Sequence, residues 1–156
     1  MNQKNILMYN YVFDEWHGWD IDEKEQEKLS QVKSLFISKS TSIVNILIGE
    51  IDCSAHFILE KIDVDPNNSK LYSNDSNSII TKNEQTLLLG CKNTIIPNGV
   101  KTIFWAAFLG CDIEKINIPS SVETIDELAF GNCKKLTEIT INNGVKKNRL
   151  LCFLQV

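Results

Sequence analysis

The chain has 156 residues, of which 43% are hydrophobic and 23% charged, a composition typical of one soluble globular domain. Its net charge of −4 and pI of about 5.2 argue against nucleic acid as a partner, because nucleic-acid-binding domains usually carry a basic stripe. No apolar run is long enough to span a membrane, and the N-terminus lacks the pattern of a signal peptide, so we expect no membrane insertion and a cytoplasmic location for the chain as it stands.

Residues 1–31 carry no repeat, and we expect them to form an N-terminal cap. The apolar run Ile6–Phe13 is a candidate strand. Residues 20–31 predict a helix, because Asp20 can cap it and Glu23 follows three residues later, as in a capping box whose first residue is Asp. End pieces of repeat arrays usually cover the open core of the first unit, and we expect this strand and helix to do the same.

Residues 32–64 are predicted to form a degraded first coil of a repeat that is clearer downstream. Leu35 and Ile37 have the spacing of the apolar strand positions found there, and Ser38 stands where later units carry proline. The tight turn that should follow has two alternative positions, neither with the usual spacing: Ala55–Phe57 and Leu47–Ile48.

Residues 64–97 are predicted to form a longer unit that contains a β-hairpin. Two short runs rich in β-branched and aliphatic residues, 77–82 and 86–90, flank a polar turn at residues 83–85, which is the pattern of two strands joined by a short loop. We expect the segment from Asn77 to Gly90 to be the only antiparallel part of the fold.

From residue 97 the sequence repeats with a period of 22 or 23 residues, giving units at 97–118 and 119–141 and a truncated unit at 142–156. The anchors of the two full units are Val100, Ile103, Ala107, Phe108, Cys111, Ile113, Ile116 and Ile118, matched by Val122, Ile125, Ala129, Phe130, Cys133, Leu136, Ile139 and Ile141. A fixed period of about 20–29 residues with aliphatic anchors indicates a leucine-rich solenoid. Such a coil buries its apolar face only by stacking on its neighbours.

The shared phase of the units predicts a mainly β solenoid with a parallel sheet. We expect strands around Ile62, Ile95, Ile116 and Ile139 to lie parallel in one sheet, in that order. Leu136, Ile139 and Ile141 should point inward, because apolar and polar residues alternate in a half-buried strand. Phe108 and Phe130 should be buried and stacked, one coil apart.

The five cysteines are explained by the repeat. Cys111 and Cys133 occupy the same position in successive units, and we expect them to be small buried hydrophobic residues. An odd number of cysteines and the absence of a CxxC pair disfavour a disulfide framework or a zinc site, although a disulfide or metal role is the alternative. The remaining cysteines are Cys53, Cys91 and Cys152.

The sequence contains no pattern of a catalytic site. His17 and His56 are far apart in the chain, and no GxSxG, P-loop or HExxH motif is present. Asp14, Glu15, His17 and Asp20 lie close together in sequence and could hold a metal, but a solvated loop is the favoured interpretation. We therefore predict no cofactor, no metal and no catalytic residue.

The candidate binding site is the outward face of the strands. Outward positions in equivalent places are Glu60, Lys61, Asp63, Glu114, Lys115, Asn117, Thr137, Glu138 and Thr140. Solenoids commonly bind partners on such extended faces. A charged strand face that serves only solubility is the alternative, and for any single residue it is the favoured one.

The pattern IPxxVxxIxxxAFxxCxxLxxIxIP resembles the BspA-type leucine-rich repeat, and the upstream hairpin unit is similar to the longer unit of that family. The resemblance covers about Leu59 to Ile141. It implies surface adhesion or binding to partner proteins, and a cell-surface location for longer members of the family. From the residues, the leading hypothesis is a non-catalytic protein-interaction module.

Two alternatives are a structural spacer, or fragment of a longer repeat protein, and, less favoured, an enzyme.

The third copy stops at Val156 before its strand, so the preceding strand is expected to expose an edge, and exposed edges pair with other chains. We therefore predict self-association through the C-terminal coil, besides an unidentified protein partner.

Overall fold

The computed structural model of the chain describes residues 6–9, 33–39 and 59–148. Several predicted features lie outside these residues: the helix at 20–31, both alternative turns between 47 and 57, His17 and His56. The described residues contain strands and turns but no helix, so the helical part of the predicted cap finds no support there.

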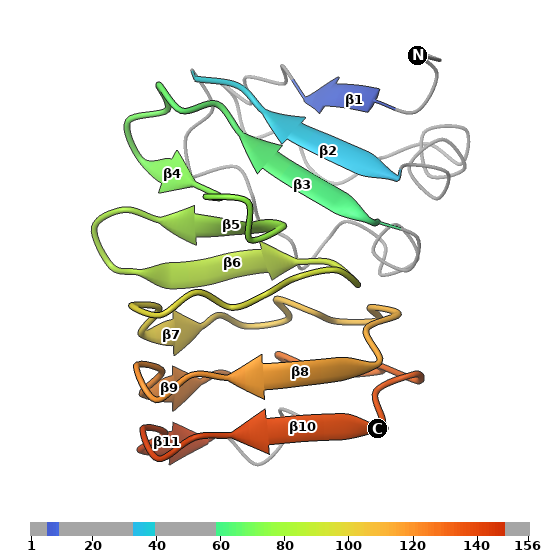
Figure 1. Cartoon of the computed structure of the whole chain (residues 1–156), viewed down its shortest axis with the longest axis vertical. Helices are drawn as coiled ribbons and strands as arrows, with labels where there is room; N and C mark the ends of the chain where they lie inside the picture. The colour runs from blue at the N-terminus through green and yellow to red at the C-terminus, as the bar shows by residue number, and fades with distance from the viewer. Residues whose placement is uncertain (1–5, 10–32, 40–58, 149–156) are drawn as a thin grey trace, which may run out of the picture.

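The N-terminal part is a sheet of three parallel strands (Figure 1), in the order β1 (Ile6–Tyr9), β2 (Ser34–Ile37) and β3 (Lys61–Val64). A strand within residues 6–13 is thus confirmed, and so is the strand of the degraded first coil. The backbone of β1 continues the sheet beyond β2. The boundary between cap and solenoid at residues 31/32 stays a prediction.

The central part is antiparallel: β4 (Leu71–Tyr72), β5 (Ser78–Thr81) and β6 (Thr86–Gly90). The β5–β6 hairpin is the predicted one. The prediction of a single antiparallel hairpin is wrong, because β4 also pairs antiparallel with β5. Sequence patterns do not reveal β4, since a strand of two residues is too short to show alternation.

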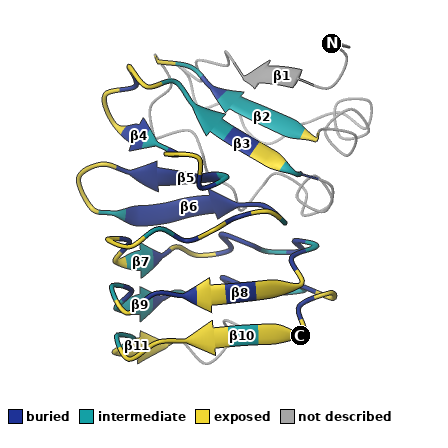
Figure 2. Ribbon diagram, viewed as in Figure 1, coloured by how far each residue is buried: buried dark blue, intermediate teal, exposed yellow. Residues whose placement is uncertain are grey.

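The hairpin separates two apolar cores. Every residue of β5 and β6 is buried (Figure 2). Ile80 and Leu87 pack into the core of the C-terminal coils, whereas Ile79 and Leu89 pack into the core beneath the N-terminal strands. This explains why the two strands are apolar runs, since a strand covered on both faces has no solvent side.

The C-terminal coils form two rows of short strands, seen one behind the other in Figure 1. One row is β8 (Lys115–Ile118) with β10 (Glu138–Ile141). The other is β7 (Thr102–Ile103), β9 (Thr124–Ile125) and β11 (Lys147–Asn148), which continue the sheet of β6. Their registers pair Ile103 with Ile125 and Ile116 with Ile139, so the predicted alignment of the repeats is confirmed.

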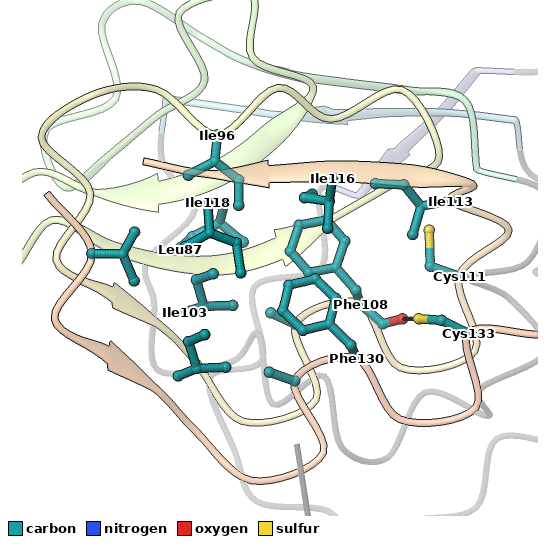
Figure 3. Packing of buried hydrophobic residues seen from close by; sticks show 14 of the residues in the cluster. Leu87, Ile96, Ile103, Phe108, Cys111, Ile113, Ile116, Ile118, Phe130 and Cys133 are labelled. Carbon is teal, nitrogen blue, oxygen red and sulfur yellow. Dashed lines mark hydrogen bonds between the residues drawn. The ribbon is translucent and has the colours of Figure 1, made fainter. Parts of the chain in front are cut away.

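Phe108 and Phe130 lie at the centre of the C-terminal core (Figure 3). Both are fully buried, and their rings stack with centroids 5.0 Å apart and planes 10° apart, as predicted. Ala106 and Leu128, two residues before each ring, have φ of 56°. These left-handed residues reverse the chain in each coil, and the fully buried Ala107 and Ala129 let the chain pass close to its neighbour.

The prediction of one continuous parallel sheet is wrong at Ile95. The trace through residues 92–96 runs in the same direction as β3 and β8 (Figure 1), but it forms no strand, and Ile95 is 75% exposed. Aligning Pro97 with Pro119 places Ile95 opposite the outward-facing Asn117.

Asparagine side chains replace the missing backbone ladder beside β3. Asn93 Nδ2 donates to the carbonyl of Glu60 (3.0 Å), and Asn77 accepts from the amide of Ile62 at 3.4 Å while donating to the carbonyl of Asn93 at 3.3 Å. One backbone hydrogen bond joins the two segments, from the amide of Lys92 to the carbonyl of Leu59 at 3.4 Å, and the asparagine side chains make further contacts.

Ile141 is more exposed than the equivalent residue of the preceding coil. The equivalent Ile118 is fully buried, whereas Ile141 is 44% exposed. Within the described residues β10 has a strand neighbour only on the β8 side, so the inward face of this last strand is covered less completely than that of β8.

Candidate functional site

Six of the nine predicted site residues come together at β8 and β10, four on the outer face of these strands and two, Glu114 and Thr137, directly before them. All six are exposed: Glu114, Lys115, Asn117, Thr137, Glu138 and Thr140. Along β8 the burial alternates between exposed and buried (Figure 2), because successive side chains of a strand point to opposite faces. The apolar repeat anchors thus fix which side chains face solvent.

The other three predicted residues, Glu60, Lys61 and Asp63, lie on or beside β3 in the N-terminal sheet. The 92–96 segment, which has no ladder, follows β3 in the stack, and β8 comes after it. The structure therefore divides the predicted face into two groups. A binding role for either group stays a prediction.

Two charges of the β8–β10 face, those of Lys115 and Glu138, are paired with each other. Lys115 Nζ lies 2.7 Å from a Glu138 carboxylate oxygen, directly across the parallel ladder. The hydrogen bond from Lys115 to Glu138 and the attraction between their charges raise the pKa of Lys115. Asn142 donates to Asn117 Oδ1 at 2.9 Å. Such exposed pairs contribute little to stability, but they fix which groups a partner would meet.

The β3 group is paired in the same way. Lys61 bonds Asp63 at 2.7 Å, and Glu60 lies 2.7 Å from Lys92 and 3.9 Å from Lys33. The hydrogen bond and charge of Lys92 lower the pKa of Glu60. The carboxylate of Glu60 thus links the first coil to the hairpin-containing unit.

Sequence reasoning missed a column of charges along the edge where β9 begins. Glu123 bonds Lys101 in the coil before it (3.2 Å) and Lys146 in the coil after it (3.0 Å), and these two lysines lower its pKa. Asp112 and Lys135 form a second pair at 2.6 Å. The signal was present in the sequence, since residues 22 or 23 apart carry opposite charges.

Three cysteines, Cys91, Cys111 and Cys133, are free and buried. Cys133 donates from Sγ to the carbonyl of Phe108 at 2.9 Å. Burial raises the pKa of Cys133 to about 11 and that of Cys111 further still. Since the thiolate is the reactive form, these cysteines behave as small apolar residues, as predicted.

Within the described residues no cluster of three histidine, cysteine, aspartate or glutamate side chains is placed to hold a metal ion. The same part of the chain contains no helix long and apolar enough to cross a membrane.

Stacked coils with a 22- or 23-residue period, parallel strands and a shared column of aromatic anchors define a leucine-rich repeat solenoid. Residues 65–156 match the BspA type leucine rich repeat region, in 6 copies. The chain therefore belongs to the BspA-type leucine-rich repeat family.

Two solved structures are similar to the chain. One is a leucine-rich repeat protein from Eubacterium ventriosum, with 24% identity and a TM-score of 0.49 over 74% of this chain and 37% of that protein. The other is the pneumococcal vaccine antigen PcpA, with 19% identity and a TM-score of 0.55 over 72% of this chain and 28% of that protein. The likeness to PcpA concerns the fold, and the chain spans well under half the length of either protein. No curated protein matches the chain.

Proposed function

We propose that the chain is a non-catalytic protein-interaction module that binds a partner through the outer face of β8 and β10. The observation that carries the proposal is the grouping of six exposed polar side chains, four on two adjacent parallel strands and two directly before them, held in place by a close-packed core. Extended faces of this kind are the usual binding surfaces of solenoids. Membership of the family supports a cell-surface role, which we propose together with the binding.

A variant that exchanges the charges of Lys115 and Glu138 tests the proposal. The double substitution Lys115→Glu/Glu138→Lys keeps an ion pair across the ladder but reverses its polarity, so folding should be preserved. We expect binding of any partner captured by the wild-type chain to fall at least about tenfold, because like charges brought into contact at an interface cost several kcal/mol. The measurement is the dissociation constant by surface plasmon resonance.

The matched control reverses the charges of the column around Glu123, with Lys101→Glu, Glu123→Lys and Lys146→Glu combined, so that both of its ion pairs, of 3.2 and 3.0 Å, are kept with opposite polarity. Partner binding should be unaffected by this second exchange. Unchanged binding after the Lys115/Glu138 exchange would instead favour the alternative, a solvated face on a structural spacer.

We also propose that the chain self-associates through the edge of β10. In the described part of the chain β10 pairs only with β8, and Ile141 on this strand is 44% exposed. An open strand edge beside exposed apolar surface is a template for pairing with another chain. Sedimentation equilibrium should show a weight-average mass that rises with concentration, and Ile141→Lys should reduce the rise. A strict monomer at high concentration would contradict the proposal.

A further inference from the structure

A cavity of about 570 Å³ lies between the C-terminal end of β3 and the loop that follows β4, apart from the β8–β10 face. Among its lining residues are two aromatic rings, from Phe36 and Tyr72, and three carboxylates, from Asp63, Asp65 and Asp75. Its lining comes from β2, the end of β3, and β4 with the loop after it, and these strands lie next to one another in Figure 1. The cavity thus has one wall from the N-terminal sheet and one from the hairpin-containing unit.

The wall formed by residues 73–77 is held in one conformation by buried hydrogen bonds. Ser73 donates from Oγ to the carbonyl of Ile62 at 3.0 Å, the amide of Ser76 donates to the carbonyl of Ser73 at 2.9 Å, and the hydroxyls of Ser76 and Ser78 lie 2.6 Å apart. Asp75 has φ of 57°, a left-handed conformation that aspartate tolerates. Because these bonds fix the turn, the cavity is formed before any ligand arrives, as ligand pockets usually are.

The three carboxylates of the cavity differ in the hydrogen bonds and ion pairs that they already make within the chain. Asp63 bonds Lys61 at 2.7 Å, and Asp65 Oδ1 accepts from the amide of Asn67 at 2.8 Å. Asp75 makes no hydrogen bond or ion pair with any residue that the structure describes. The pKa of Lys61 is raised mainly by its hydrogen bond to Asp63 and the charge of that residue, and the charge of Asp75 adds to the effect. Lys82 Nζ donates to the carbonyl of Asn68 at 2.6 Å. Asp75 is exposed, so its carboxylate is solvated in the free chain and is open to a ligand.

The aromatic lining of the cavity indicates which kind of cationic ligand would bind beside its carboxylates. Tyr72 is fixed by a hydrogen bond from its hydroxyl to Gln85 Oε1 at 2.7 Å, and its ring, like that of Phe36, is half-buried at the cavity. A metal ion is disfavoured, because in the described residues these carboxylates do not converge as a set of metal ligands. A planar guanidinium stacks on aromatic rings and bonds carboxylates in a fork geometry.

We infer that this cavity binds an arginine side chain presented by a partner protein, with Asp75 accepting from the guanidinium and the rings of Phe36 and Tyr72 flanking it. The inference rests on the proposed function as a protein-interaction module and assigns it a second contact, separate from the β8–β10 face. The other acidic groups facing the ligand are Asp63 and Asp65, and the neighbouring cations are Lys61 and Lys82.

The test is a titration of the ¹⁵N-labelled chain with a capped pentapeptide, Gly-Ser-Arg-Ser-Gly, followed by amide chemical shifts. The control peptide carries citrulline, which has the shape of arginine without its charge. We expect saturable shifts at residues 72–75 and 63–65 with the arginine peptide only. Asp75→Asn should weaken this binding at least about fivefold, because charge-assisted hydrogen bonds are the stronger ones.

Glu84→Gln removes the same charge at the exposed tip of the hairpin, outside the cavity lining, and should leave the affinity unchanged. Equal loss in the two variants, equal shifts with the citrulline peptide, or stronger shifts with calcium chloride at matched ionic strength would overturn the inference. Partner capture by the wild-type chain that depends on the Lys115–Glu138 pair, with no arginine-specific shift at the cavity, would overturn the cavity alone and leave the proposed function standing.

Discussion

Replacing Phe130 by alanine is expected to lower the free energy of unfolding by about 3–5 kcal/mol, the usual loss for a buried phenylalanine. The ring is fully buried and stacks on Phe108 with centroids 5.0 Å apart, so its removal leaves a cavity between two coils and deletes an aromatic pair. A domain of this size is typically stable by only about 5–15 kcal/mol. The variant should therefore unfold at a much lower urea concentration, monitored by circular dichroism.

The matched control is Phe104→Ala, which deletes the same ring at a position that is 38% exposed. We expect it to cost about 1 kcal/mol or less, as substitutions near the surface usually do. A loss below about 1 kcal/mol for Phe130→Ala would mean that the stacked rings are not the anchors of the solenoid, whatever the control shows.

The repeat was predictable because each of its apolar anchors occurs twice in the sequence, one period apart. Ile116 and Ile139, or Ile103 and Ile125, occur at equal phase because each coil must present an apolar side chain to the next, and the observed registers follow that phase. The burial of Phe108, Phe130, Cys111 and Cys133 was predictable for the same reason. Repetition thus carries the information that an alignment of relatives would otherwise supply.

The interruption at Ile95 was not predictable from the same pattern. Whether residues 92–96 form a ladder depends on how far the inserted hairpin separates them from β3, which is a matter of packing between segments distant in sequence. The side-chain bridges made by Asn77 and Asn93 leave no periodic trace, because asparagine is also the ordinary residue of turns.

The candidate site was predictable only in part, for a related reason. The six residues on and directly before β8 and β10 follow from the phase of the repeat. The separation of Glu60, Lys61 and Asp63 from them follows from the broken ladder. The sequence thus predicted positions within a coil better than distances between coils.

The second large effect is expected at Gly90, the last residue of β6. A Cβ at this position would lie 2.0 Å from Phe108 Cε1 and 2.4 Å from Cζ. The ring cannot move away freely, because it stacks on Phe130 on its other side. The Gly90 backbone is also fixed, since its amide donates to the carbonyl of Ala107 at 2.9 Å. Gly90→Ala should destabilise the chain by roughly 3 kcal/mol, the upper part of the usual range for overpacking.

Two companion variants show whether the clash with Phe108 is the cause of that loss. Gly131→Ala adds the same methyl group where the nearest atom is Leu109 Cδ1, at 2.9 Å, the end of a flexible side chain, so it should cost clearly less than Gly90→Ala. Phe108→Leu removes part of the obstructing ring, and residues in contact are energetically coupled. The double variant Gly90→Ala/Phe108→Leu should therefore lose less stability than the sum of the two single losses in urea unfolding. Strict additivity, or equal losses at Gly90 and Gly131, would show that the close approach of β6 to the stacked rings does not require glycine.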